Sequence, residues 1–396
     1  MSVFKEKAGS VFRSLCVENW SPLMGGIVIA FFVILLEAWY RPWGIVGGLR
    51  NWGDWVFYLL GLYEDQPPHP LWFSSSVLNI GFLWGAFLSA TLAREFSFRV
   101  PPGIEFVKAI VSGILMGIGS ALAMGCNIGG MYMAINNLAA NGLLMWIGLV
   151  IGVRFAVKYL YWEIEHLPAG GGFEINLSKI NPLLALIAIV GLFLATRAYF
   201  GSEHDNGAIL GGCLILTAGI GYAMHRSRLC IVNALREPFM SGEAAMARAV
   251  IVSLLLTTIG IAVLKAAGIR DEMAYVTPTF GLGALLGGII FGFGMTVAGG
   301  CGSGSLWRVA EGQLKLWVVA IFFGLSNSLV RHLFSVYEII YVNDEGELVS
   351  KWLGKSVFMP DYLGYAGTIL LVAVFLLIWR ILVDWNEETN RLVLEL

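Results

Sequence analysis

Ten apolar runs, each long enough to cross a lipid bilayer as a helix, dominate this chain. A hydrocarbon core of about 30 Å needs roughly 20 apolar residues in helical form. Because lipid offers no hydrogen-bond partner to peptide groups, such runs are expected to be helices. We place them at residues 22–40, 75–93, 104–124, 143–161, 182–200, 207–224, 246–266, 279–299, 316–334 and 362–382. The sequence therefore predicts an all-α polytopic membrane protein.

The composition agrees with this class and excludes several others. Of 396 residues, 58% are hydrophobic and 13% are charged, which excludes an ordinary water-soluble domain. The 25 Lys and Arg nearly cancel the 27 Asp and Glu, so no basic surface for nucleic acid is expected. No nucleotide-binding loop, metal-ligand spacing or Ser/His/Asp order is present. We therefore expect no cofactor, no metal and no enzymatic activity.

The basic residues predict an orientation in the membrane. Residues 1–21 lack the apolar core of a signal peptide and are expected to form a cytoplasmic leader. If the leader is inside and Arg154 is set aside as intramembrane, 16 Lys and Arg fall on the inner side and 8 on the outer side. The positive-inside rule then places both termini in the cytoplasm, with the chain in the inner membrane.

Four further segments are too apolar for simple loops and too rich in glycine for full crossings. They cover residues 41–62, 125–142, 225–242 and 300–314. Irregular backbone survives at membrane depth only where protein or a polar cavity satisfies its peptide groups. We interpret the four segments as short re-entrant helices that surround a central pathway.

An internal repeat indicates a duplicated chain. Residues 113–130 align without gaps on residues 288–305, which pairs Cys126 with Cys301 at an offset of 175 positions (301 − 126). A second match pairs Gly44 with Cys230. Such duplications are common in transporters, where the substrate path lies between the repeats.

The repeat predicts how the chain is divided. Each half has four full spans, so a single linking span inverts the second half relative to the first. The predicted parts are a leader at 1–21, halves at 22–162 and 207–335, a linker with its span at 163–206, and a loop, last span and cytoplasmic tail at 336–396.

Two glycine-flanked cysteines stand at matching breaks of the two halves. Cys126 and Cys301 each follow an apolar helix and precede a short one, where bare peptide N–H groups can bind an anion. Taken singly, each thiol is as well explained by packing as a small apolar side chain. Their matching positions favour a shared role in the path. The supporting path residues are Gly125, Asn127, Gly129, Gly300, Gly302 and Ser303.

A third break carries Cys230, followed by Arg236. Arginine beside a thiol in the path would attract an anion, so we include both as candidates. Arg226 and Arg228 precede this break, and their simplest role is anchoring a helix end at the inner surface.

Other features have structural explanations. Arg308 and Glu311 have helical i,i+3 spacing and are expected to pair with each other. Cys16 and Cys213 are expected to be inert. Glycine pairs spaced by four at Gly113/Gly117, Gly148/Gly152 and Gly288/Gly292 fit either dimerisation or packing within one chain.

At these motifs the sequence resembles the YeeE/YedE family of sulfur-transport membrane proteins. The resemblance rests on LAMGCN at 122–127, the stretch 227–236 around Cys230, and VAGGCGSGSLWRVAEGQ at 297–313. It implies an hourglass-shaped inverted repeat that takes up thiosulfate, with Cys126, Cys230 and Cys301 passing the ion along by weak S–H hydrogen bonds. It also implies a small TusA-like sulfur-carrier partner. A branch associated with selenium metabolism is equally similar, through ALREP at 234–238.

The leading hypothesis is thus a transporter for thiosulfate or a related sulfur or selenium compound. One alternative is a membrane thiol or persulfide redox protein, which the absence of a nearby resolving cysteine in the sequence disfavours. Another is a small-anion channel in which the cysteines are incidental.

Overall fold

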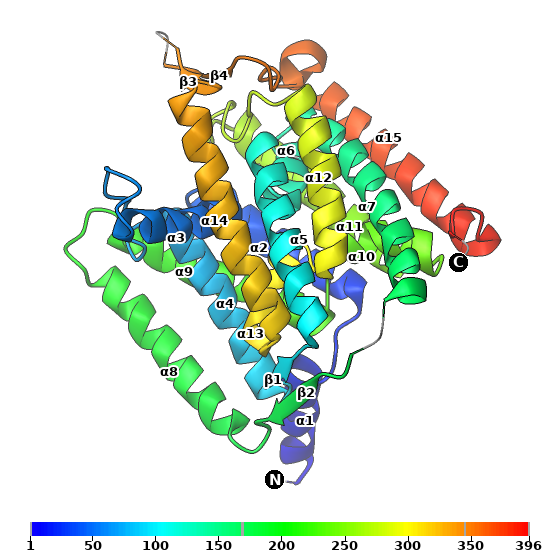
Figure 1. Ribbon diagram of the computed structural model, residues 1–396. Helices are drawn as coiled ribbons and strands as arrows, with labels where there is room; N and C mark the ends of the chain where they lie inside the picture. The colour runs from blue at the N-terminus through cyan, green and yellow to red at the C-terminus, as the bar shows by residue number, and fades with distance from the viewer. Residues whose placement is uncertain (1, 168–169, 344–345, 395–396) are drawn as a thin grey trace.

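The computed structural model describes residues 2–167, 170–343 and 346–394. Within them, ten helical segments are long and apolar enough to cross a membrane, and every predicted span overlaps one of them. These helices are α2 (Pro22–Trp39), α4 (Ser74–Leu92), α5 (Gly103–Leu122), α7 (Ala140–His166), α8 (Asn181–Phe200), α9 (Gly207–Ser227), α11 (Ala245–Ala266), α12 (Leu282–Ala298), α14 (Leu314–Val336) and α15 (Pro360–Thr389). The predicted all-α polytopic membrane fold is confirmed (Figure 1).

Each of the four predicted breaks contains a short helix. They are α3 (Val46–Leu59), the π-helical segment η2 (Asn127–Met133) with its continuation α6 (Ala134–Asn136), α10 (Ile231–Met240) and α13 (Gly302–Glu311). Three of these helices begin directly after a cysteine, because Cys126, Cys230 and Cys301 are extended residues that precede the first helical turn. The path cysteines therefore all stand at helix N-termini.

The remaining elements lie at the two ends of the helical bundle. The leader forms α1 (Ser2–Phe12) and the π-helical η1 (Arg13–Val17). Strand β1 (Ser97–Val100) pairs antiparallel with β2 (Phe173–Asn176), and β3 (Ile340–Val342) pairs antiparallel with β4 (Leu348–Ser350). Figure 1 places these two small sheets at opposite ends of the molecule.

Close contacts between long helices depend on glycine. Helix α7 packs along α12, α5 along α14, α4 along α9, and α2 along α11. Between α7 and α12, a Cβ added at Gly148 would lie 3.0 Å from the Cα of Gly288, and one added at Gly288 would lie 3.1 Å from the Cα of Gly148. At Gly113, an added Cβ would lie 2.7 Å from the carbonyl oxygen of Val319 in α14. The spaced glycines are therefore used for packing inside this chain.

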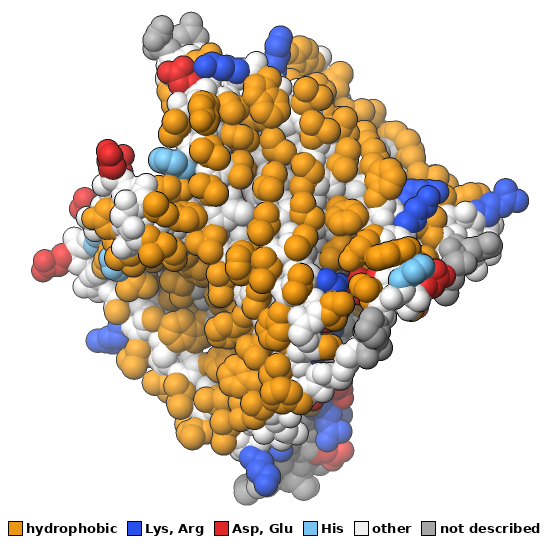
Figure 2. Space-filling view, in the orientation of Figure 1, with side chains coloured by type: hydrophobic (Ala, Val, Ile, Leu, Met, Phe, Trp, Pro, Cys, Tyr) orange, Lys and Arg blue, Asp and Glu red, His pale blue; other side chains and the backbone are white. Residues whose placement is uncertain are grey.

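The outer surface matches a lipid environment. Figure 2 shows apolar side chains over most of the visible face, with charged groups mainly toward its margins. Large apolar side chains such as Phe155, Leu183 and Phe193 are well exposed. Exposed apolar surface on this scale is typical of helices that face lipid.

Candidate functional site

Cys126 lies against the first turn of α13, the short helix that follows Cys301. The peptide N–H of Gly302, the first residue of α13, donates a hydrogen bond to Oδ1 of Asn127 in η2 (3.1 Å). A Cβ added at Gly302 would lie 3.1 Å from Sγ of Cys126. The N-termini of η2 and α13 therefore face each other, and only glycine allows so close an approach at this point.

The other two thiols form a pair. Sγ of Cys230 and Sγ of Cys301 are 3.5 Å apart. Sγ of Cys301 also accepts a hydrogen bond from the peptide N–H of Gly304 (3.3 Å) and lies 3.6 Å from Oγ of Ser303. All three path cysteines are fully buried. The structure thus brings Cys126, Cys230 and Cys301 into one cluster at the ends of three short helices.

The Cys230–Cys301 pair bears on the alternative of a thiol redox protein. The absence of a resolving cysteine nearby in the sequence disfavoured thiol redox chemistry. In the fold, Cys230 and Cys301 are 71 residues apart along the chain yet lie in hydrogen-bond contact. That argument against redox chemistry was wrong, because the two N-termini converge through packing of separate segments.

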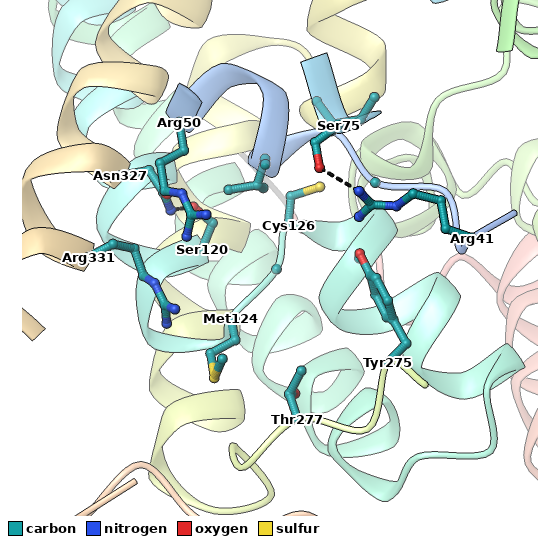
Figure 3. Close-up of a pocket in the computed structure, with 16 residues that line it drawn as sticks. Arg41, Arg50, Ser75, Ser120, Met124, Cys126, Tyr275, Thr277, Asn327 and Arg331 are labelled. Atoms are coloured by element: carbon teal, nitrogen blue, oxygen red, sulfur yellow. Dashed lines mark hydrogen bonds between the residues drawn. The ribbon is translucent and has the colours of Figure 1, made fainter. Parts of the chain in front are cut away.

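A cavity of about 220 Å³ lies on the Cys126 side of the cluster. Gly125, Cys126 and Gly129 form part of its wall, and Arg41, Arg50 and Arg331 line it from three other segments. Figure 3 shows Arg50 and Arg331 on one side of Cys126 and Arg41 on the other. Among the described lining residues no carboxylate is present, so the cavity favours an anion.

The three arginines differ in how they are held. Nη1 of Arg41 donates hydrogen bonds to Oγ of Ser74 (2.7 Å) and Oγ of Ser75 (2.8 Å). Nε of Arg50 lies 3.9 Å from Oδ2 of Asp54. Nη1 of Arg331 is buried and has no hydrogen-bond partner among the described residues. Arg331 therefore keeps the capacity to bind an anion in the cavity.

A second cavity of about 420 Å³ continues from the first. It shares Arg50 and Arg331 with the inner cavity and adds Asp54, Tyr63 and His332. Residues of the connection between α3 and α4 complete its rim. The shared residues place the two cavities next to each other, and together we call them the vestibule.

Arg308 lies on the opposite side of the thiols. Its Nη1 is 3.8 Å from Sγ of Cys230 and 3.4 Å from the carbonyl oxygen of Gly304. Its guanidinium carbon is 4.3 Å from the ring centre of Trp307. The predicted Arg308–Glu311 pair was wrong, because Arg308 points toward the thiols while Glu311 binds Arg228 (2.8 Å) and Arg99 (3.2 Å).

An ion-pair cluster adjoins helix α13. Arg226 is fully buried and pairs with Glu95, and Arg228 pairs with Glu95 (2.9 Å) and Glu311 (2.8 Å). The prediction that both arginines simply anchor a helix end at the membrane surface was therefore wrong for Arg226. Glu95, His225 and Glu311 offer possible metal-ligand atoms within 4.8 Å of one another, but the arginines already bind the two carboxylates.

Of the other predicted path residues, Gly300 lies directly before Cys301, whereas Arg236 lines neither cavity. Gly300 accepts a hydrogen bond at its carbonyl oxygen from Ser305 (3.2 Å). Arg236 donates from Nη2 to Asn233 (3.2 Å), and its buried Nε has no partner among the described residues. Cys213 is buried in α9 and lines neither cavity.

Sequence reasoning missed Arg41, Arg331 and Tyr275 as lining residues. Arg331 lies inside the predicted span 316–334. Because a cation at bilayer depth is energetically costly, its position alone could have marked Arg331 as a functional candidate. That ground singled out Arg154, Arg236, Arg308 and Glu311 instead, and of these Arg154 is exposed and lies over the ring of Phe239 at 5.8 Å. Arg41 and Tyr275 carried no comparable signal.

Comparisons with known proteins agree with this architecture. The family described as sulphur transport matches residues 2–155 and 226–394. A probable transporter YedE of Salmonella typhimurium is 25% identical over 405 aligned positions, which cover 95% of this chain and 94% of the relative. The thiosulfate transporter TsuA of Escherichia coli is 31% identical over 31% of this chain and 34% of its own length. TsuA of Spirochaeta thermophila is 27% identical over 40% of this chain and 50% of its own length. The resemblance inferred from the motifs is confirmed, and the chain belongs to the sulphur-transport family of membrane proteins.

Proposed function

We propose that this protein takes up thiosulfate, or a closely related sulfur or selenium anion, across the bacterial inner membrane. The observation that carries the proposal is the arginine-lined cavity that ends at Cys126, with Cys301 and Cys230 directly beyond it. The relatives called thiosulfate transporters support the choice of substrate. The anion passes from the vestibule to Cys126, then to Cys301 and Cys230.

The chemistry of the path suits a doubly charged, polarisable anion. Arginine binds oxyanions through paired hydrogen bonds and concentrates them at the cavity. Thiols are weak donors, so they guide the ion through the constriction without holding it. Binding that is favourable at several sites but strong at none is what conduction requires.

The inverted duplication of residues 22–162 and 207–335 is part of the proposal. Under it, α2, α4, α5 and α7 correspond to α9, α11, α12 and α14. Exchanging each helix for its counterpart turns the α4–α9 contact into the α11–α2 contact, and the α7–α12 contact into the α14–α5 contact. All four contacts are present in the structure. This reciprocity supports a twofold relation with the thiols near its axis.

The orientation follows from the distribution of charge. With both termini in the cytoplasm, the vestibule opens outward, and the cluster of Glu95, Arg226, Arg228 and Glu311 faces the cytoplasm. A TusA-like sulfur carrier would collect the anion's sulfur on that side. This protein itself performs no catalysis in the proposal.

Growth of a thiosulfate-uptake-deficient bacterium on thiosulfate as sole sulfur source tests the proposal. The wild-type chain should restore growth and uptake. Cys126→Ala and Cys301→Ala should each reduce uptake at least about tenfold, the scale of one lost hydrogen bond to an ion. Cys213→Ala is the matched control, since Cys213 is equally buried but lines neither cavity. Wild-type uptake by a Cys126Ala/Cys230Ala/Cys301Ala variant would leave only a channel with incidental cysteines.

A second candidate, a thiol redox protein, is favoured by one observation, the 3.5 Å separation of Cys230 and Cys301. Exchange with a disulfide of a partner protein would oxidise this pair: the Cys230–Cys301 S–S bond forms, the partner's S–S bond breaks, and the two protons and two electrons pass to the partner's sulfurs. Mass spectrometry of the protein after turnover distinguishes the candidates. Transport by hydrogen bonding leaves both thiols free, whereas redox chemistry leaves a Cys230–Cys301 disulfide or a persulfide.

A further inference from the structure

Helix α2 carries a carboxyl group at bilayer depth that has no role in the path described above. Glu37 lies in the last turns of this span, and its side chain is fully buried. Neither of its carboxyl oxygens has a hydrogen-bond partner among the described residues. An isolated buried carboxylate is costly, and ionisable groups inside membrane spans commonly serve ion or proton pathways.

Cations face Glu37 from neighbouring elements, but each is bound to another acceptor. Nζ of Lys265, from α11, donates to the carbonyl oxygens of Asn137 (3.1 Å), Glu272 (2.8 Å) and Ala274 (2.9 Å). Arg270, which follows α11, donates to the backbone carbonyls of Glu37 and Ala38 at the end of α2. These two cations therefore lie near the carboxyl group without binding it.

The other polar groups around Glu37 are also engaged. Arg41, one turn further along the chain, donates to Ser74 and Ser75. Nδ2 of Asn137 donates one hydrogen bond, to the carbonyl oxygen of Met133 (3.0 Å). Because neither carboxyl oxygen of Glu37 has a partner among the described residues, this group can take up or release a proton without breaking an ion pair.

Glu37 lies near the cavity that we take as the anion site. Arg41, four residues further along the chain, lines this cavity. Arg270, which donates to the backbone carbonyl of Glu37, is followed five residues later by Tyr275, another lining residue. Two segments at the end of α2 therefore form part of the cavity wall. In such surroundings of low polarity, electrostatic interactions are strong.

We infer that Glu37 is a proton-binding site coupled to anion binding in the adjacent cavity. When the anion enters, a proton from the outer solution adds to a carboxylate oxygen of Glu37 and forms an O–H bond. The bond breaks when the anion leaves, and the proton returns to water. This inference rests on the proposed function, because it takes the cavity as the anion site.

The sign of the coupling follows from charge. An ionised Glu37 repels an anion in the cavity, and protonation removes that repulsion. Coupling between two ligands is reciprocal, so the bound anion also favours the protonated form of Glu37. Anion affinity should therefore increase as the pH falls and Glu37 takes up its proton.

Isothermal titration calorimetry of thiosulfate into the full-length protein in detergent tests this coupling. Buffers that differ in ionisation enthalpy report how many protons are taken up with each anion at each pH. Wild type should take up a proton on binding, and its Kd should rise with pH by up to about tenfold per unit. Glu37→Gln, a neutral isostere of the protonated form, should bind with no proton uptake and with a pH-independent Kd.

The control is Glu163→Gln. Glu163 pairs with Lys108 and lines neither cavity, so its variant should keep the wild-type proton uptake. Binding to wild type without proton uptake would overturn the inference and leave the proposed function intact. Proton uptake that persists in Glu37→Gln would exclude Glu37 as the site. No thiosulfate binding to wild type would overturn the proposed function together with the inference.

Discussion

At the scale of single residues, Arg331 has the clearest unmet hydrogen-bonding capacity in the cavity wall. Its buried Nη1 has no partner among the described residues. Replacing Arg331 with Gln should therefore weaken thiosulfate uptake, with KM raised by about 10- to 100-fold, because a hydrogen bond to a charged group contributes about 1.5–3 kcal/mol. Uptake of radiolabelled thiosulfate over a range of concentrations measures this change.

Arg154→Gln is the control for this loss of charge. Arg154 is an exposed arginine that contacts Phe239 on another part of the bundle, so its variant should keep the wild-type KM. If Arg331→Gln and Arg154→Gln had the same KM, the cavity would not be the anion site, whatever happened to the total amount of uptake.

At the scale of elements, the α7–α12 contact depends on glycine at position 288. A Cβ there would lie 2.7 Å from the carbonyl oxygen of Met145 and 3.1 Å from the Cα of Gly148. Both are backbone atoms, so the helices must separate. We expect Gly288→Ala to destabilise the protein by about 1–3 kcal/mol, the usual cost of overpacking. Thermal unfolding in detergent should show a lower midpoint for Gly288→Ala. Gly103→Ala, with open space at its Cβ, should unfold like wild type.

The helices could be predicted from the sequence, whereas most of the candidate site could not. The ten spans and the four short helices follow from local signals, namely the length of apolar runs and the glycines that interrupt them. The candidate site depends instead on contacts between distant segments. Arg41 and Arg331 reach one cavity from distant parts of the chain, and Cys230 meets Cys301 across 71 residues. Those contacts depend on how α12, α13 and α14 pack, and no local pattern encodes that packing.

At the scale of the whole molecule, the direction of uptake depends on which end faces the cytoplasm. The vestibule rim includes the connection between α3 and α4, which contains Asp65 and Gln66. The C-terminal tail lies at the other side, where the peptide N–H of Leu394 donates to the carbonyl oxygen of Phe239 (2.9 Å). Under the positive-inside rule, the excess of Lys and Arg on the leader side predicts that this side faces the cytoplasm.

Labelling of introduced cysteines in intact cells tests this orientation. Cys16 is first replaced by Ser, because it is the native cysteine that is not buried. The first variant, Glu64→Cys, changes an exposed residue in the connection between α3 and α4. The second, Glu388→Cys, changes an exposed residue near the end of α15. A membrane-impermeant maleimide should label Glu64→Cys in intact cells and Glu388→Cys only after the cells are opened. The reverse pattern would put the arginine-lined vestibule on the cytoplasmic side. The same path would then serve export of the anion, since the cavity next to Cys126 would collect it from inside the cell.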